Sequence, residues 1–280
     1  MKGFADFRKT KEYLVCVDSD GCAMDTMDVK HFECFGPCMV DEWELSEWRE
    51  EILSRWNDIN LYTMTRGINR FRGLALALSE INEKYKSIDG IEELRSWADT
   101  APELSNSAIE AMLAVGASPI FAKALSWSKA VNRGIGALPL EAKQPFPLVG
   151  EALERAHSFA DVAIVSSANL DAVLEEWQTH GLVGSVDVIM TQNDGSKAHC
   201  IRKLVELGYA RDKVLMCGDA PGDLDAADKC GVYFYPILVG RERESWEEFI
   251  KVGAERLETA CYGGDYADKV RREFYKNLGN

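Results

Sequence analysis

The chain has 280 residues, of which 46% are apolar and 28% charged, so it is long enough for a sizeable folded core. Its formal net charge of −14 argues against nucleic acid or an anionic membrane as a partner. No apolar stretch approaches the roughly 20 residues that span a membrane, and the first residues do not form a signal peptide. The eight cysteines are scattered, which is typical of reduced thiols and predicts a cytoplasmic protein.

The first predicted element is an apolar strand over residues 13–17 that ends in Asp18-Ser-Asp20-Gly21. Alternate side chains point the same way, so Asp18 and Asp20 can both face the crevice in which open α/β sheets bind ligands. Two close carboxylates repel each other, which predicts a hard metal ion between them, a raised pKa, or both. The alternative interpretation is a strand end followed by an ordinary Asp-Gly surface turn.

A long segment with almost no strand signal follows, and its pattern predicts helices over residues 41–56, 69–85, 91–98, 105–115 and 119–131. The stretch from Arg66 and Gly67 to Arg70 lies at a loop-to-helix junction in this region. It is either a solvated basic turn with Asn69 as N-cap, or a loop that recognises substrate. The second interpretation arises because an acidic protein must concentrate positive charge where it binds an anion.

Strand and helix patterns alternate after the proline-containing stretch at residues 144–147. Strands are predicted over 162–165, 186–190, 214–217 and 232–238, and helices over 171–180, 198–207, 223–230, 244–257 and 266–278. Short apolar strands that alternate with helices are typical of a parallel sheet covered on both faces. We therefore predict an α/β fold in which residues 1–23 and 145–280 form a Rossmann-like parallel sheet core. Residues 24–144 are expected to form an inserted all-helical domain.

Four short motifs in this sequence resemble those of the haloacid dehalogenase-like hydrolases and occur in the same order. They are Asp18-x-Asp20-Gly, Ser166 after a strand, Lys197, and Gly218-Asp219-x-x-x-Asp223. The resemblance covers residues 12–23 and about 145–240, with Cys22 where the family usually has threonine. It implies a phosphatase type in which the helical insertion, between the first and second motifs, is a cap that closes over the active site.

The resemblance also implies a role for each motif residue. Asp18 would be the nucleophile, and Asp20 the general acid and base. Ser166, the following Ser167 and Lys197 would bind the phosphate. The implied magnesium ligands are Asp18, Asp20 through its backbone carbonyl, Asp219 and Asp223.

The cap carries a further resemblance. In β-phosphoglucomutase-like members of the family, a Gly-x-x-Arg segment at this place contacts substrate phosphate. Gly67 to Arg70 resembles that segment, and Arg66 is a second candidate.

We therefore expect a Mg²⁺-dependent phosphatase that hydrolyses a small soluble phosphomonoester, a phosphorylated metabolite, through an aspartyl-phosphate intermediate. One alternative is a phosphomutase of the same superfamily, which holds a second phosphate in the cap. Another is a non-catalytic binding protein on this fold, against which the set Asp18, Asp20, Lys197 and Asp219 argues. We expect a monomer or homodimer with no nucleic-acid or membrane partner.

Overall fold

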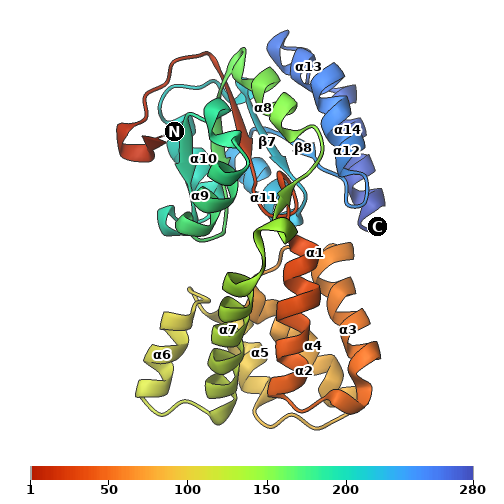
Figure 1. Ribbon diagram of the computed structural model, residues 1–280. Coiled ribbons are helices and arrows are strands. Elements are labelled where there is room, and N and C mark those ends of the chain that lie inside the picture. The colour runs from red at the N-terminus through yellow and green to blue at the C-terminus, as the bar shows by residue number, and fades with distance from the viewer. Residues whose placement is uncertain (1, 280) are drawn as a thin grey trace. The chain divides into compact units, whose positions relative to one another are not determined.

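The computed structural model describes residues 2–279, which fall into two compact units. The sheet unit contains the chain up to Met27 and from Leu140 onward, and the helical unit is Asp28–Pro139 (Figure 1). The sequence analysis places the two boundaries between these units four to five residues away, between residues 23 and 24 and between residues 144 and 145. Among the described residues, no helix combines the length and the apolar character that a membrane crossing requires.

The sheet unit is built on a six-stranded sheet in which all neighbouring strands are parallel. In spatial order the strands are β1 (Lys2–Gly3), β6 (Val188–Met190), β5 (Ala160–Val165), β2 (Tyr13–Val17), β7 (Val214–Gly218) and β8 (Tyr233–Pro236). The five longer strands are those that the sequence predicts, so the predicted fold class is confirmed. The two-residue edge strand β1 is too short to leave a periodic signal.

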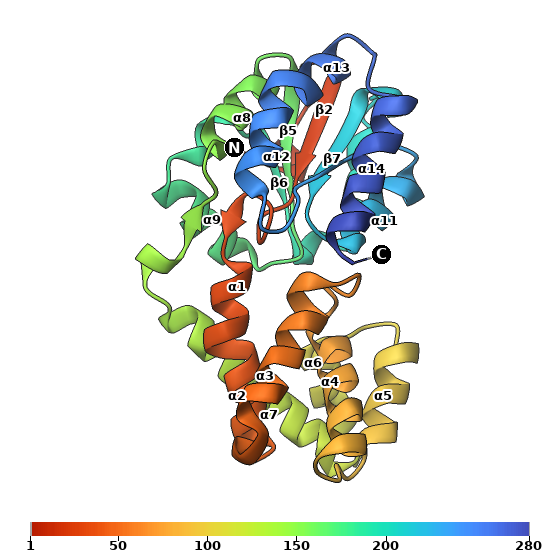
Figure 2. The same cartoon turned by 90° about the vertical axis from the view of Figure 1, so that its right-hand side faces the viewer.

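Helices cover both faces of this sheet (Figure 2). They are α8 (Val149–His157), α9 (Leu170–Thr179), α10 (Lys197–Val205), α11 (Pro221–Cys230), α12 (Glu242–Glu248), α13 (Ala254–Glu258) and α14 (Asp265–Asn277). A π-helical turn, Phe249–Gly253, links α12 to α13. Val15 and Val17 of β2 pack in one apolar cluster with α8, α9 and α12. The sequence analysis gives no bounds for α8, although its buried side chains recur at helical spacing.

A second, two-stranded sheet pairs β3 (Met24–Asp25) with β4 (Gln144–Pro145) in antiparallel register. Next to it, the Phe146 amide donates to the Ala23 carbonyl at 2.9 Å. The segments through which the chain leaves and re-enters the sheet unit are therefore paired with each other.

The helical unit begins within α1 (Met27–Lys30), at Asp28. Its helices are α2 (Gly36–Glu42), α3 (Arg49–Asn57), α4 (Arg70–Lys84), α5 (Ile91–Thr100), α6 (Asn106–Ala114) and α7 (Pro119–Ala137), with π-helical turns at His31–Phe35 and Asp58–Tyr62. Its core is rich in aromatic side chains. The Trp127 ring centroid lies 6.0 Å from that of Trp56 and 6.1 Å from that of Phe71.

The single helix predicted over residues 41–56 is wrong. The helix α2 ends at Glu42, and Glu44 adopts a left-handed backbone with φ of 54°. The Leu45 amide then donates to the Val40 carbonyl at 2.9 Å, which closes the helix end in the manner of a Schellman motif. Leu45 is fully buried, so packing of this side chain favours the turn over a continuous helix.

Asp161 of β5 anchors the segment that precedes β2. Its carboxylate is fully buried and accepts hydrogen bonds from the Thr10 amide at 2.9 Å and the Lys11 amide at 3.0 Å. The hydroxyls of Thr10 and Tyr209 donate to it as well. Burial raises the pKa of Asp161, but these hydrogen bonds lower it more strongly, so the carboxyl pKa lies below its ordinary value.

Asp161→Asn is expected to destabilise the protein by about 3 kcal/mol near pH 7, because the buried carboxylate loses its charge and one of the two oxygens that accept from its four donors. A carboxyl with a lowered folded-state pKa stabilises the protein above its unfolded pKa, about 3.9, and this stability is lost as pH falls through the lower folded value. Urea unfolding at pH 7 and at pH 3 should therefore show the difference between wild type and variant shrinking in acid. The exposed Asp212→Asn is the control, and a wild-type midpoint for Asp161→Asn would contradict this role.

Candidate active site

The carboxyl ends of the parallel strands meet at one edge of the sheet. The chain runs from β2 to β5 and β6 on one side, then crosses to β7 and β8 on the other. The end of β2 is therefore the point where the strand order reverses, which is where open α/β sheets bind ligands. Asp18 follows β2, Ser166 follows β5, and Asp219 follows β7. The Asp18 amide donates to the Cys217 carbonyl at 3.0 Å, so Asp18 is held beside the end of β7.

Lys197 lies between two of the motif carboxylates. It is the first residue of α10, whose N-cap is Ser196. The Nζ atom is 2.6 Å from Asp18 Oδ2 and 2.6 Å from Asp223 Oδ1. Carboxylate oxygens of Asp18, Asp219 and Asp223 lie within 4.8 Å of one another, and all three residues are buried. The sheet edge therefore brings together a buried ammonium and three acids.

Burial and ion pairing have opposite effects on the pKa values of Asp18 and Lys197. Burial raises the pKa of Asp18 well above its ordinary value, and the neighbouring Lys197 ammonium counteracts only part of that rise. Burial lowers the pKa of Lys197, but the Asp18 and Asp223 carboxylates raise it by more, so the net shift is upward. Lys197 therefore remains a cation at neutral pH.

Close packing places Asp223 in this group. Its Oδ2 atom accepts a hydrogen bond from the Ala220 amide at 3.1 Å. A Cβ atom at Gly218 would lie 2.3 Å from Asp223 Cγ, a distance at which only glycine fits. By contrast, a Cβ atom at Gly222 would have no atom of this kind within 4 Å. Close approach of backbone and side chain therefore requires glycine at 218 and not at 222.

Asp20 lies in the turn that follows Asp18. Gly21 turns the chain with φ of 81°, and the Thr26 hydroxyl donates to Asp20 Oδ1 at 2.5 Å. The Asp20 side chain does not belong to the group of three carboxylates that could hold a metal among the described residues. The sequence analysis missed Thr26, for which the only signal is a hydroxyl residue shortly after the Asp-x-Asp-Gly motif.

Ser166 and Ser167 differ in their surroundings. Ser166 is buried and its Oγ accepts a hydrogen bond from the Ala168 amide at 3.1 Å, whereas Ser167 is exposed. The N-cap of α9 is Asn169, whose side chain accepts from the Asp171 amide at 2.9 Å. Ser166 therefore orders the loop before the helix and does not cap the helix itself.

The predicted cap residues lie at the start of α4 in the helical unit. Arg66 is buried and its Nη1 donates to the Leu61 carbonyl at 2.8 Å, and Gly67 has φ of 66°. Arg70 Nη1 donates to Ser128 Oγ at 3.0 Å and to Asn132 Oδ1 at 2.7 Å. Burial lowers the pKa of Arg70. Arg70 therefore helps to join α4 to α7.

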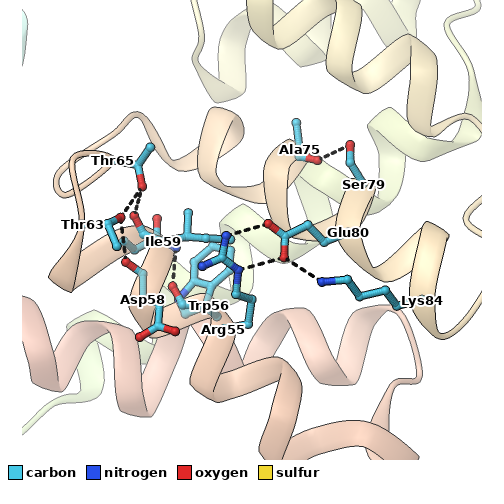
Figure 3. Close-up of polar contacts among 11 residues, drawn as sticks. Arg55, Trp56, Asp58, Ile59, Thr63, Thr65, Ala75, Ser79, Glu80 and Lys84 are labelled. Carbon is cyan, nitrogen blue, oxygen red and sulfur yellow. Dashed lines mark hydrogen bonds and ion pairs between the residues drawn. The ribbon is translucent and has the colours of Figure 1, made fainter. Parts of the chain in front are cut away.

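The loop before these residues is ordered by its own threonines (Figure 3). The Thr63 hydroxyl donates to the Asp58 carbonyl at 3.0 Å, and the Thr65 hydroxyl donates to the Ile59 carbonyl. In the same view, Arg55 Nε and Nη2 each donate to Glu80 at 2.8 Å, which joins α3 to α4. Arg55 is thus an arginine of the helical unit with a purely structural ion pair, which makes it a useful control for Arg70.

One comparison with known proteins finds the same resemblance in part of the chain. The model of the haloacid dehalogenase-like hydrolases matches residues 119–237. This range contains Ser166, Lys197, Asp219 and Asp223 but not the first motif. No curated protein matches the sequence.

Two solved structures share the fold. A protein described as a candidate phosphoglycolate phosphatase from Lactobacillus delbrueckii subsp. bulgaricus is 17% identical, with a TM-score of 0.52 over 91% of this chain and 100% of that one. A protein described as a candidate beta-phosphoglucomutase from Thermotoga maritima is 18% identical, with a TM-score of 0.51 over 87% and 99% of the two chains. These likenesses show the fold, and the match to the family model confirms the predicted resemblance over residues 119–237.

Proposed function

Because this chain resembles the haloacid dehalogenase-like hydrolases in its motifs and its fold, we propose that it is a phosphatase acting on a small phosphorylated metabolite. The observation that carries the proposal is the buried group at the sheet edge, in which Lys197 contacts both Asp18 and Asp223 at 2.6 Å. A nucleophile, a cation that offsets phosphate charge and a set of oxygen ligands are thereby combined in one place.

Asp18 is the proposed nucleophile. Its carboxylate oxygen forms a bond to phosphorus while the bond from phosphorus to the leaving oxygen breaks, giving an aspartyl-phosphate. The Lys197 ammonium, next to Asp18 Oδ2, offsets the negative charge that gathers on the phosphoryl oxygens. Ser166 and Ser167, with nearby backbone amides, are the proposed phosphate-binding groups of the β5 end.

Asp20 is the proposed general acid and base. It donates its proton to the leaving oxygen, and as a carboxylate it then takes a proton from the water that attacks phosphorus. That attack releases inorganic phosphate and regenerates Asp18. The hydrogen bond from Thr26 to Asp20 supports this proposal, because it fixes the orientation of a carboxyl that must serve both steps.

The donor set fits Mg²⁺. Asp18, Asp219 and Asp223 offer three buried carboxylates within 4.8 Å, and hard oxygen ligands are those that Mg²⁺ prefers. We propose that they hold the ion together with the Asp20 backbone carbonyl. When bound, Mg²⁺ supplies positive charge that offsets the repulsion between an anionic nucleophile and an anionic phosphate.

The experiment that tests this function is hydrolysis of 4-nitrophenyl phosphate and of a panel of phosphorylated metabolites, with Mg²⁺ and with EDTA. We expect phosphate release with Mg²⁺ and its loss with EDTA. Absence of release from every compound would favour a non-catalytic binding protein. Conversion of a sugar phosphate to its isomer without phosphate release would favour a phosphomutase, the alternative that the Gly67-to-Arg70 segment suggests.

We further propose that the protein works in the cytoplasm as a monomer or homodimer, without nucleic-acid or membrane partners. All eight cysteines are free thiols, which agrees with a reducing compartment. The net charge of −14 agrees with the absence of a polyanionic partner.

Arg70→Ala is expected to lower kcat/KM for the best metabolite of the panel by about 30-fold, while 4-nitrophenyl phosphate changes by less than about twofold. The reason is that a guanidinium grips a distal carboxylate or phosphate, which the aryl compound lacks. Among the described residues, only Nη1 of Arg70 has hydrogen-bond partners, so Nε and Nη2 remain available as donors.

The matched control for this prediction is Arg55→Ala, which removes a structural arginine from the same unit. Steady-state kinetics on both substrates and thermal unfolding of both variants separate recognition from stability. Equal losses on the two substrates, or the same losses in the Arg55 variant, would show that Arg70 only joins α4 to α7.

A further inference from the structure

The loop that carries Asp18 and Asp20 contains several hydrogen bonds between its own backbone groups. The amides of Cys22, Ala23 and Met24 all donate to the Ser19 carbonyl, at 3.3, 3.0 and 2.8 Å. These bonds shape the turn, but they do not attach it to the rest of the sheet unit. At β7, the Cys217 carbonyl accepts from the Asp18 amide at 3.0 Å and from the Cys22 thiol at 3.5 Å. Two further hydrogen bonds reach the loop from helices, and both donors are tryptophan indoles.

Trp177 of α9 provides the first attachment. Its Nε1 donates to Ser19 Oγ at 2.9 Å, across 158 positions of sequence, and both residues are fully buried. Ser19 stands between the two aspartates of the first motif. A bond to its side chain therefore constrains the residue immediately after Asp18 and immediately before Asp20.

Trp246 of α12 provides the second attachment. Its Nε1 donates to the Cys22 carbonyl at 3.1 Å, across 224 positions of sequence, and its side chain is 1% exposed. The neighbouring residue fixes this helix: Ser245 Oγ accepts from the Leu238 amide at 3.0 Å, and the Ser245 carbonyl accepts from the Tyr235 hydroxyl at 2.6 Å. The C-terminal helix α12 is thus tied to β8 and, through Trp246, to the loop.

We propose that Trp177 and Trp246 are positioning residues that hold the Asp18–Cys22 loop in its reactive geometry from two separate helices. An indole N–H only donates, and its rigid ring is buried, so each bond has one geometry. A displacement of about 1 Å of a catalytic group can cost about 100-fold in rate. This inference rests on the proposed function, and it gives α12 a role in the active site.

The test compares Trp177→Phe and Trp246→Phe, which keep an aromatic ring and lose only the donor and part of the bulk. Each is expected to lower kcat for 4-nitrophenyl phosphate by about tenfold with KM changed less than about twofold, because the nucleophile is misplaced while the binding groups remain. Amide hydrogen exchange of residues 22–24 should become about tenfold faster in both variants.

The matched control is Trp127→Phe in the helical unit. Trp127 is also fully buried and donates its indole N–H to a backbone carbonyl, that of Phe35, at 3.1 Å. It should lose similar thermal stability but leave kcat and the exchange of residues 22–24 at wild-type values. A loss of kcat in this control equal to that of the other two variants would overturn the proposal, because general destabilisation would then explain it.

Ser19→Ala removes the acceptor of Trp177 without disturbing the tryptophan core. It should reproduce the effects of Trp177→Phe, and the double variant should be no worse than either single one. Additive losses, or unchanged exchange at residues 22–24, would overturn the positioning role. Hydrogen exchange needs no turnover: if the wild type hydrolyses nothing but exchange responds as expected, the proposed function fails while the attachment of the loop stands.

Discussion

Asp18→Asn is expected to reduce turnover of 4-nitrophenyl phosphate by at least about 1000-fold, because an amide cannot form the aspartyl-phosphate. The substitution keeps the shape of the side chain. The amide oxygen can still accept the Ser19 backbone N–H, which now donates to Asp18 Oδ1 at 2.8 Å. Lys197 keeps its second partner, Asp223, so the buried ammonium retains a counter-charge.

The measurement is steady-state release of 4-nitrophenol, together with thermal unfolding to establish that the variant is folded. Asp212→Asn changes an exposed aspartate in the short helical turn Arg211–Lys213, directly before β7, and should keep wild-type turnover. Rapid acid quench of the wild type during turnover, followed by peptide mass spectrometry, should place the phosphoryl group on Asp18. Substantial turnover by a folded Asp18→Asn protein would refute the covalent mechanism.

Asp219→Asn is expected to lower activity at saturating Mg²⁺ by at least about 100-fold and to raise the Mg²⁺ concentration required for half-maximal activity. Asp219 is one of three buried carboxylates within 4.8 Å, and an amide in its place offers a neutral oxygen where the ion prefers an anionic one. The effect of Asp223→Asn on activity should be more complex than a loss of metal binding, since Asp223 also contacts Lys197 and the Ala220 amide.

Mn²⁺ binding followed by electron paramagnetic resonance gives a readout of this site that does not require catalysis. Weaker binding is expected for Asp219→Asn and unchanged binding for Asp225→Asn, which lies on α11 two residues after Asp223 and pairs with Lys229. Wild-type metal affinity in Asp219→Asn would show that the ion, if bound, lies elsewhere.

The parts of this fold that the sequence predicts are those with a strong local signal. The strand that ends at Asp18 and the strand that ends at Asp219 are apolar runs that stop at a charged residue, and parallel pairing brings their ends together. The turn at Glu44 lacked such a signal, because burial of Leu45, and not a breaker residue, ends the helix there.

The supporting contacts of the candidate site are harder to predict because they depend on the complete fold. The indole of Trp177 looks like an ordinary core side chain in the sequence, and nothing local indicates that it donates to Ser19. The same holds for Thr10 and Asp161, which lie 151 positions apart and become partners only when β2 and β5 pair. Such contacts can be recognised only once the tertiary structure is known.

The central position of β2 has a consequence for biosynthesis. Its two neighbours begin at Ala160 and Val214. More than half of the chain must therefore be synthesised before β2, the first long strand, has a strand to pair with. Contacts between such distant segments form slowly, and an unpaired apolar strand is prone to aggregate. The helical unit, by contrast, is complete at Pro139, before either neighbour of β2 has been synthesised. During translation we therefore expect the insertion to fold first, while Tyr13–Val17 depends on chaperones until the sheet can close around it.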